Sequence, residues 1–232
     1  MKIKKKDKFL SQLLAKKCFI IKEKKDLKNY KNIKGKYLLI LKTRKKLKFS
    51  EYKNFYLSMS SKLITFKKKL SEYAKLEYDC RFACKKDFKK IMQICSQNLL
   101  GSRFEKDRLI SKNFLSIYRS VWLTNFFKKK RGDYLIVAYK KKTILGFVLL
   151  IKEVGNLRID QILVNNRYKK KGVAKTLVKF INNFFFKRYK FILAGTYDHN
   201  CIAKRMYLKM GFLKIKAYTN IYHLYPKFKS QI

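Results

Sequence analysis

Proline, tryptophan, histidine and acidic side chains are scarce in this chain of 232 residues. It has one proline, one tryptophan and two histidines, and only 14 aspartate and glutamate residues against 60 lysine and arginine residues. Five cysteines, odd in number and without a C-x-x-C pair, do not predict a zinc site beside two histidines, and no metal is expected. Thiols of this kind suit a reducing compartment, so the sequence predicts a cytoplasmic protein.

Long apolar runs are also absent. The longest, such as residues 144–151, are far shorter than the roughly 20 residues that a helix needs to cross a bilayer. The amino terminus begins like a signal peptide, but Lys16 and Lys17 interrupt its apolar stretch before a hydrophobic region of the usual length forms. The sequence therefore predicts a mature protein without a membrane span.

The formal net charge of +46 is the feature present in greatest excess. Such a charge can indicate a nucleic-acid or membrane partner. Arginine supplies only ten of the 60 basic residues, however, and the abundant lysine, isoleucine, asparagine, phenylalanine and tyrosine are the residues of A/T-rich codons. The lysines also spread along the whole chain instead of forming one block, which favours a solvated surface over a nucleic-acid-binding stripe, with anionic partners as the alternative.

The pattern of apolar residues changes near residue 75. Before it, short apolar runs at residues 18–21, 37–41 and 63–66 are separated by basic, polar segments and are typical of strands. We predict a small α+β domain over residues 1–75, which either packs against the second domain or forms one wall of a substrate cleft.

Residues 76–232 predict a mixed α/β sheet flanked by helices. A strand at 78–83 and a helix capped by Asp87 come first, and a second helix follows. Core packing is the favoured interpretation of the aromatic face of that second helix, although Tyr118 and Trp122 could also face a ligand. Its apolar face is formed by Phe114, Ile117, Tyr118, Val121 and Trp122.

The remaining elements lead into and out of a basic loop. A hairpin of residues 133–139 and 143–151, with Gly146 at a point of close backbone approach, precedes a strand at 158–164. After the loop we predict elements in the order helix, strand, helix and hairpin, with bounds at 172, 191–195, 200–210 and 212–225.

The helix that begins at Gly172 predicts an anion site. Its first turn offers unpaired backbone N–H groups and the positive end of the helix dipole, which suit a pyrophosphate. Gly172 and Ala174 matter because small residues let the backbone approach such a group. Lys169, Lys170 and Lys171 either add positive charge there or form a solvated basic loop.

The helix after the last parallel strand adds a candidate acid. Asn200 is a good N-cap, and Ala203 and Tyr207 share one helix face. A phenol, with an ordinary pKa of about 10, is protonated at neutral pH and can give its proton to a departing thiolate. Taken alone, Tyr207 is better explained as a core residue.

The two segments together resemble the GNAT superfamily of N-acetyltransferases. KKKGVA at 169–174 resembles the Q/R-x-x-G-x-G/A loop of that family, and N-x-x-A-x-x-x-Y-x-x-x-G-F follows at 200–212, with Lys169 replacing the usual glutamine or arginine. The resemblance implies the GNAT acyl-CoA N-acyltransferase fold and acetyl-CoA as co-substrate. The implied cofactor-binding residues are Leu163, Val164, Lys169, Lys171, Gly172, Val173, Ala174 and Asn200.

A narrower resemblance covers almost the whole chain. SRFEKDRLISKNFLSIYRSVWLTN at 102–125 resembles the S-R-F…D…Y-x-x-W-x-x-N segment of the dTDP-fucosamine acetyltransferase family, and residues 62–70 and 222–223 resemble other parts of it. This implies acetylation of a nucleotide-linked amino-deoxy sugar for surface-polysaccharide synthesis. Arg103 could then meet a diphosphate and Trp122 could stack on a ring, with core or surface roles as alternatives.

The resemblance also implies direct transfer, in which a neutral amine attacks the thioester carbonyl while both substrates are bound. A backbone N–H near Leu163 or Val164 would hold the oxyanion, and Tyr207 would protonate the thiolate. The general base is either Asp160 or Glu153, acting directly or through water. Strand alternation places Asp160 on the same face as Ile162, which also allows Asp160 to be a partly exposed strand residue without a catalytic role.

Two other functions fit parts of the sequence. A protein or ribosomal N-acetyltransferase would use the same motifs, but the long amino-terminal extension favours a small-molecule pocket. A basic RNA-binding module on a degenerate acetyltransferase scaffold would not require Gly172 and Tyr207, and both are present. The predicted partner is therefore an amino sugar, with a homodimer possible.

Overall fold

The computed structural model describes residues 6–31, 33, 35–71, 74–98 and 101–227. In this part of the chain, one mixed sheet has the strand order β1-β2-β9-β3-β8-β7-β6-β5-β4. The strands are β1 Lys17–Ile21, β2 Tyr37–Thr43, β3 Phe55–Lys69, β4 Asp79–Phe82, β5 Tyr134–Lys140, β6 Thr143–Glu153, β7 Asn156–Val164, β8 Phe191–Tyr197 and β9 Leu213–Pro226.

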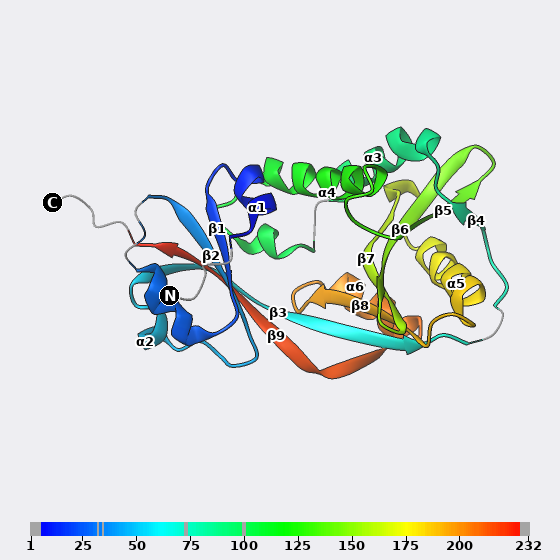
Figure 1. Cartoon of the computed structure of the whole chain (residues 1–232). Coiled ribbons are helices and arrows are strands. Elements are labelled where there is room, and N and C mark those ends of the chain that lie inside the picture. Colours follow the sequence, from blue (N-terminus) through cyan, green and yellow to red (C-terminus); the bar gives the residue numbers. More distant parts are fainter. Residues whose placement is uncertain (1–5, 32, 34, 72–73, 99–100, 228–232) are drawn as a thin grey trace.

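Helices cover both faces of the sheet (Figure 1). The α-helices are α1 Lys8–Leu13, α2 Phe49–Tyr52, α3 Phe88–Ser96, α4 Lys112–Phe127, α5 Val173–Phe185 and α6 Cys201–Lys209. The shorter 3₁₀ helices are η1 Lys24–Tyr30, η2 Lys85–Asp87, η3 Arg103–Lys106 and η4 Asn166–Tyr168. The mixed α/β architecture predicted from the sequence is confirmed.

The long strands β3 and β9 join the two ends of the molecule (Figure 1). β9 pairs with β2 on one side and β3 on the other, and β3 also pairs with β8. The apolar run at 63–66 is therefore only the middle of a longer strand. Because the sheet continues across residue 75, the two-domain division stays a prediction about folding units and does not mark a break in the sheet.

The predicted hairpin at 212–225 is wrong, because these residues form the single strand β9. Its second half, from Asn220 to Tyr225, is buried between β2 and β3, whereas most of the first half is exposed. β3 pairs with both halves of β9, and β2 pairs with the second half, so the chain needs no turn to satisfy its backbone groups. The change from an exposed first half to a buried second half gave this single strand the sequence pattern of a hairpin with two arms.

Helix α4 reaches from one half of the sheet to the other (Figure 1). Its start contributes Phe114 and Leu115 to the core beside α1, and Leu123 near its end packs with α3 and β6. Ile117 is 51% exposed, so it does not share the buried face that the sequence assigned to it. The face of α4 that meets the sheet instead includes Tyr118, which contacts the rings of Phe104 and Trp122.

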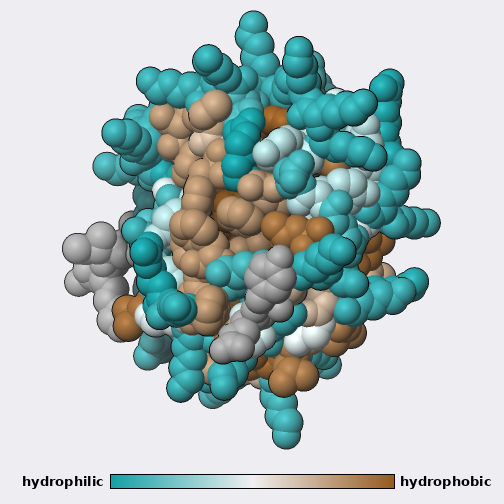
Figure 2. Space-filling model, turned by 90° about the vertical axis from the view of Figure 1, so that its right-hand side faces the viewer, coloured by the Kyte–Doolittle hydropathy of each residue, from teal (hydrophilic) through white to brown (hydrophobic). Residues whose placement is uncertain are grey.

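An apolar area lies on the side of the molecule that carries α5 and β4 (Figure 2). Phe82 of β4 and Phe184 of α5 are both exposed, and their ring centroids lie 5.0 Å apart. Phe180 stacks on Phe184 at 5.9 Å. Hydrophilic side chains surround this area.

Candidate active site at the splayed strands

Strands β7 and β8 are paired at one end and separate toward the other. Their parallel pairing runs only from Asn156–Phe191 to Ile159–Ala194. Beyond it, β7 continues along β6 and β8 continues along β3. Asp160 is an extra residue in the ladder with β6, because Leu150 pairs with Ile159 and Leu149 with Gln161. Such a bulge bends a strand, which explains why β7 turns away from β8 here.

The backbone of β7 points alternately toward β6 and toward β8. The Asn165 amide donates to the Leu145 carbonyl at 2.8 Å, so residue 165 faces β6. Antiparallel alternation then directs the backbone groups of Leu163 toward β6 and those of Val164 toward the splayed side. Of the two amides proposed for the oxyanion, that of Val164 is directed to the place where β8 has left the ladder.

The loop before α5 has the backbone geometry of an anion cradle. Gly172 is the N-cap of α5 with φ +79°, and no side chain caps the helix there. A Cβ on Gly172 would lie 2.1 Å from Oε2 of Glu77, so Glu77 would have to move, and the positive φ strains any other residue at this position. Val173 is buried and packs against Gly146, at which an added Cβ would meet the Val173 side chain at 3.0 Å. The close approach predicted at Gly146 is therefore present.

The basic side chains of this loop extend into solvent. Lys169 and Lys171 are exposed, and the Lys171 ammonium lies 5.6 Å from the centre of the Tyr168 ring. The Lys171 carbonyl accepts a hydrogen bond from the Tyr78 hydroxyl at 2.8 Å, which fixes the loop backbone. The lysines can thus add positive charge around a ligand, while the fixed backbone gives the loop its shape.

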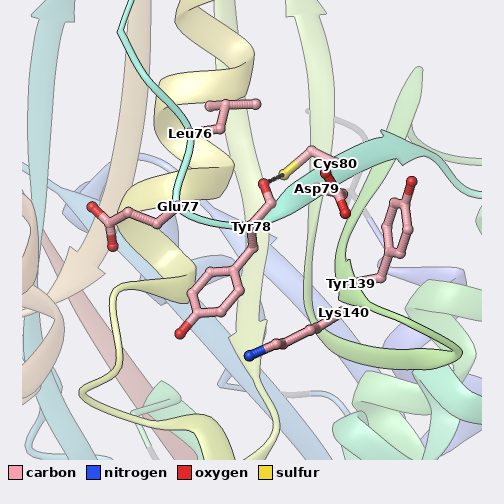
Figure 3. A pocket seen from close by; sticks show the side chains of 7 residues that line it. All are labelled: Leu76, Glu77, Tyr78, Asp79, Cys80, Tyr139 and Lys140. Atoms are coloured by element: carbon pink, nitrogen blue, oxygen red, sulfur yellow. Dashed lines mark hydrogen bonds between the residues drawn. The ribbon is translucent and has the colours of Figure 1, made fainter.

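A pocket of about 400 Å³ adjoins the loop through Tyr78 and Glu77 (Figure 3). Its lining also includes the Asp79 carboxyl and the Lys140 ammonium. Two carboxylates make this pocket a poor place for a pyrophosphate, because like charges repel. The Glu77 carboxylate also lies beside Gly172, so it would have to move for an anion to bind at the start of α5.

Helix α6 holds the two residues predicted for it. The Asn200 side chain caps the helix by accepting from the Ala203 amide at 3.1 Å, as the sequence predicted. Tyr207 is 4% exposed, and its ring lies 5.5 Å from that of Phe66 and 5.3 Å from that of Phe212. Burial raises the pKa of Tyr207, which keeps the phenol protonated at neutral pH. Among the described residues, none forms a hydrogen bond with its hydroxyl.

Both carboxylates proposed as the base are engaged in ion pairs. Asp160 accepts two hydrogen bonds from Arg131, at 2.7 and 2.8 Å, and its side chain is 8% exposed. Glu153 is paired with Arg158 at the end of β7 where β7 and β8 are still joined. Ile162 packs on the α5 side of the sheet, so the expected shared face of Asp160 and Ile162 is wrong; the bulge at Asp160 breaks the alternation.

The two predicted substrate residues lie in one aromatic and basic cluster beneath α4. The Arg131 guanidinium is 4.6 Å from the Trp122 ring, and Tyr118 contacts Trp122 at 4.9 Å. Arg103 stacks on Phe104 at 4.5 Å and donates to the Tyr197 hydroxyl at 3.5 Å. The ring contact between Tyr118 and Phe104 connects the two arginines.

Sequence reasoning missed several members of this region. Arg131 comes from the turn after α4, and Tyr197 and His199 come from the end of β8. An arginine within the lysine-rich run KKKRGD is the signal that could have indicated Arg131. Three buried polar atoms here have no partner among the described residues: Arg103 Nε, Gln161 Oε1 and His199 Nε2.

The described part of the chain includes no helix with the length and hydropathy needed to cross a membrane. Within the same residues, no group of three or more histidine, cysteine, aspartate or glutamate side chains is placed to hold a metal ion.

Residues 101–212 match the Acetyltransferase (GNAT) family. The matched segment, slightly less than half of the chain, is a GNAT acetyltransferase domain, and members of this family use acetyl-CoA. The expected enzyme class and fold are confirmed.

The sequence identity to an individual relative is low. The chain is 24% identical over 141 residues to the spore coat polysaccharide biosynthesis protein SpsD of Bacillus subtilis, a match that covers 60% of this chain and 48% of that protein. The chain thus spans about half the length of this curated relative.

Solved structures share the fold at low identity. A conserved protein of unknown function from Staphylococcus epidermidis superposes with a TM-score of 0.62 at 14% identity, covering 91% of this chain and 84% of the other. A GCN5-related N-acetyltransferase from Sphaerobacter thermophilus gives a TM-score of 0.54 at 14% identity, covering 82% and 60% respectively.

Proposed function

We propose that this protein transfers the acetyl group of acetyl-CoA to the amine of a nucleotide-linked amino-deoxy sugar used in surface-polysaccharide synthesis. The observation that carries the proposal is the cluster beneath α4, where Arg103 and Arg131 lie among the rings of Trp122, Tyr118 and Phe104. Guanidinium groups bind diphosphates, and aromatic rings stack on bases and sugars. The name of the relative SpsD supports a role in polysaccharide synthesis.

The loop before α5 suits acetyl-CoA. The free N–H groups after Gly172 favour the pyrophosphate, and the positive φ of Gly172 favours a glycine at this position. Splaying of β7 and β8 leaves backbone groups of both strands without sheet partners, and these can bind the amides of a pantetheine arm. Lys169 and Lys171 contribute charge from the solvent side.

The chemistry then divides between the two strands and α6. The amine attacks the thioester carbonyl, and the Val164 amide stabilises the negative charge that develops on the carbonyl oxygen. The phenol of Tyr207 donates its proton to the sulfur as the C–S bond breaks. Because Tyr207 lies in the core on the α5 side and the arginine cluster lies on the α4 side, cofactor sulfur and acceptor approach from opposite faces.

The proposal includes a cytoplasmic location. Cys18, Cys80, Cys84, Cys95 and Cys201 are all free thiols. Thiols persist in a reducing compartment.

The direct test is to incubate the protein with acetyl-CoA and a panel of dTDP- and UDP-linked amino sugars beside basic peptides, measuring free thiol and product mass. We expect acetylation of one or more nucleotide sugars. Acetylation of peptides alone would support a protein N-acetyltransferase and rule out the sugar assignment.

Arg103 provides a more local test of the acceptor site. We expect Arg103→Gln to raise the KM for the nucleotide sugar at least tenfold and to leave the affinity for acetyl-CoA unchanged. Arg108→Gln is the matched control, because Arg108 is an exposed arginine of the same segment. Equal effects of the two substitutions would show that only general charge is involved.

A further inference from the structure

With Asp160 and Glu153 held in ion pairs, the proposed reaction still needs a group that removes the proton from the attacking amine. We propose that His199 is this catalytic base, and that Ser61 and Asp198 are the positioning residues that hold its ring. The inference rests on the proposed acetyl transfer, but it does not depend on the acceptor being a sugar.

His199 lies two residues beyond the end of β8, and its Nδ1 contacts Ser61 of the neighbouring strand β3. Tyr197 and His199 point to the same face, and their rings stack with a centroid distance of 5.8 Å and an angle of 13°. The hydroxyl of Tyr197 in turn contacts Arg103. His199 therefore borders the basic and aromatic cluster that we assign to the acceptor.

The hydrogen bonds of His199 determine which ring nitrogen is free. Ser61 Oγ is 2.7 Å from Asp198 Oδ1 and 3.2 Å from His199 Nδ1. An ionised carboxylate only accepts, so the serine proton is donated to Asp198 and the serine oxygen must accept from Nδ1–H. In the neutral ring the lone pair then lies on Nε2, the nitrogen that a base uses.

This Nε2 is buried and has no partner within the described residues. The side chain as a whole is 17% exposed. A buried ring nitrogen without a hydrogen bond costs stability, and such an atom beside a site indicates that a ligand completes it. An amine of the acceptor is a suitable donor to this lone pair.

The charged and titratable groups around the ring come from several elements. Asp198 belongs to the same turn, Ser61 and Lys62 belong to β3, and Tyr197 belongs to β8. The Lys62 ammonium lies 5.0 Å from the Tyr218 ring, and its backbone amide donates to Asp198. Asp198 accepts this bond together with those from Ser61 and the His199 amide, which fixes the carboxylate.

The only other histidine, His223, is placed differently. Its Nδ1 is 2.6 Å from Asp107 Oδ2, and the residue is fully buried in the core between β9 and η3. Burial lowers the pKa of His223 to about 4, so it remains neutral there. Its Nε2 is likewise buried without a partner among the described residues, but its ring packs on Phe104 in the core, whereas His199 lies just beyond the end of β8.

The proposed reaction conserves atoms and protons, although its two proton transfers take place on opposite faces of the sheet. The amine nitrogen bonds to the carbonyl carbon and releases a proton to His199 Nε2, while the C–S bond breaks and the sulfur takes the proton of the Tyr207 hydroxyl. The products are the amide, the free thiol, an imidazolium and a phenolate. A proton that passes from His199 through water to Tyr207 restores both groups, so one amine proton ends on the thiol.

The tautomer can be tested without any substrate. Two-bond ¹⁵N–¹H correlation spectra of protein labelled in histidine should show His199 with its proton on Nδ1 and a lone pair on Nε2. His223→Gln identifies which set of signals is His199. A proton on Nε2 in the neutral ring would overturn the inference, because that nitrogen could then not accept from an amine.

Kinetics test the role itself, with whichever amine the wild-type protein acetylates. We expect His199→Gln to lower kcat/KM for the acceptor by about 100-fold, with unchanged affinity for acetyl-CoA, and to remove the fall in rate at acidic pH that a histidine base causes. Added imidazole should restore part of the rate of His199→Ala. An unchanged rate and pH profile would contradict the role of His199.

Ser61 is tested through its effect on the ring. We expect Ser61→Ala to lower kcat about tenfold and to leave the acceptor KM unchanged, and Ser61→Thr, which keeps the hydroxyl, to recover most of the activity. Equal losses in both variants would contradict a positioning role. If the protein acetylates peptides and no amino sugar, the sugar assignment fails while the same measurements on the peptide still decide the role of His199.

Discussion

Tyr207 is the side chain on which the proposed acid step depends. Its ring is held between Phe66 and Phe212, while no described residue forms a hydrogen bond with its hydroxyl. Ring packing, and not hydrogen bonding to a described residue, thus fixes the position of the phenol. Burial raises the pKa of Tyr207, so the hydroxyl carries the proton that the proposed acid step requires.

We predict that Tyr207→Phe lowers kcat by about 100-fold, the usual contribution of a general acid. The affinity for acetyl-CoA should stay within about twofold, because phenylalanine keeps both ring contacts. Thiol release measures the first quantity and calorimetric titration the second. Unchanged turnover would remove Tyr207 as the acid.

Gly172 makes the second prediction at this scale. Gly172→Glu places a side chain where Glu77 already lies, at a positive φ that favours glycine, and adds negative charge beside a phosphate site. We expect the Kd for acetyl-CoA to rise at least tenfold in a calorimetric titration.

Gly155→Glu is the matched control for this loss. Gly155 also has a positive φ, at +66°, but an added Cβ there meets nothing within 4 Å, and the residue lies in the turn between β6 and β7. Both variants have a strained backbone, but only Gly172→Glu places a negative charge at the loop before α5. An equal loss of affinity in the two variants would mean that the cradle is misplaced.

At the scale of elements, the sequence predicted what local signals determine. The start of α5 at Gly172 and the cap of α6 at Asn200 were correct because a positive φ and a capping oxygen are properties of a few neighbouring residues. Pairing between segments that are distant in the sequence was harder to predict. The bulge at Asp160 depends on the register with β6, and β9 is one strand because β3 pairs with both of its halves.

The candidate site shows the same difference between local features, which the sequence predicts, and features that depend on distant segments. The cofactor loop is continuous in sequence, so its residues could be predicted together. The acceptor face joins η3, α4, the following turn, β3 and β8, and only the folded sheet brings Arg131, Tyr197 and His199 to Arg103 and Trp122. No sequence pattern indicated His199, because its partner Ser61 is 138 residues away.

The connection between η3 and the sheet predicts a pH dependence of stability. Asp107, the residue after η3, accepts hydrogen bonds from His223, Tyr225, Ser58 and the Leu109 amide. Burial acts to raise the pKa of Asp107, but the bonds from His223 and Ser58 outweigh it, and the pKa is lowered. The neutral, buried His223 has a pKa lowered to about 4, mainly by desolvation.

Because the folded protein leaves His223 unprotonated while the unfolded chain protonates it at its usual pKa near 6.5, stability falls as the pH drops from about 6.5 to 4. The loss from this group amounts to about 3 kcal/mol. Asp107 adds its own loss only at still lower pH. Urea unfolding at a series of pH values measures the slope, and His223→Gln, which can still donate to Asp107, should flatten it; an equally steep slope in that variant would contradict the assignment.

At the scale of the whole molecule, charge opposes folding. The 14 acidic residues can neutralise at most 14 of the 60 basic ones, which leaves the formal excess of 46. Positive charges spread over a compact surface repel one another more than they do in the expanded unfolded chain. This repulsion has the range of the Debye length, about 10 Å at 0.1 M salt, so added salt reduces it.

We therefore predict that the melting temperature rises by several degrees between 20 and 300 mM sodium chloride. The same salt should weaken RNA binding, because neutralising phosphates with lysines releases counterions whose return becomes favourable at high salt. Calorimetry and filter binding on one preparation measure both effects. The RNA-binding alternative would be favoured by three results together: a constant melting temperature, an RNA affinity that falls steeply with salt, and no binding of acetyl-CoA. Such results would indicate that the positive charge serves a nucleic-acid stripe and is not a repulsion distributed over the whole surface.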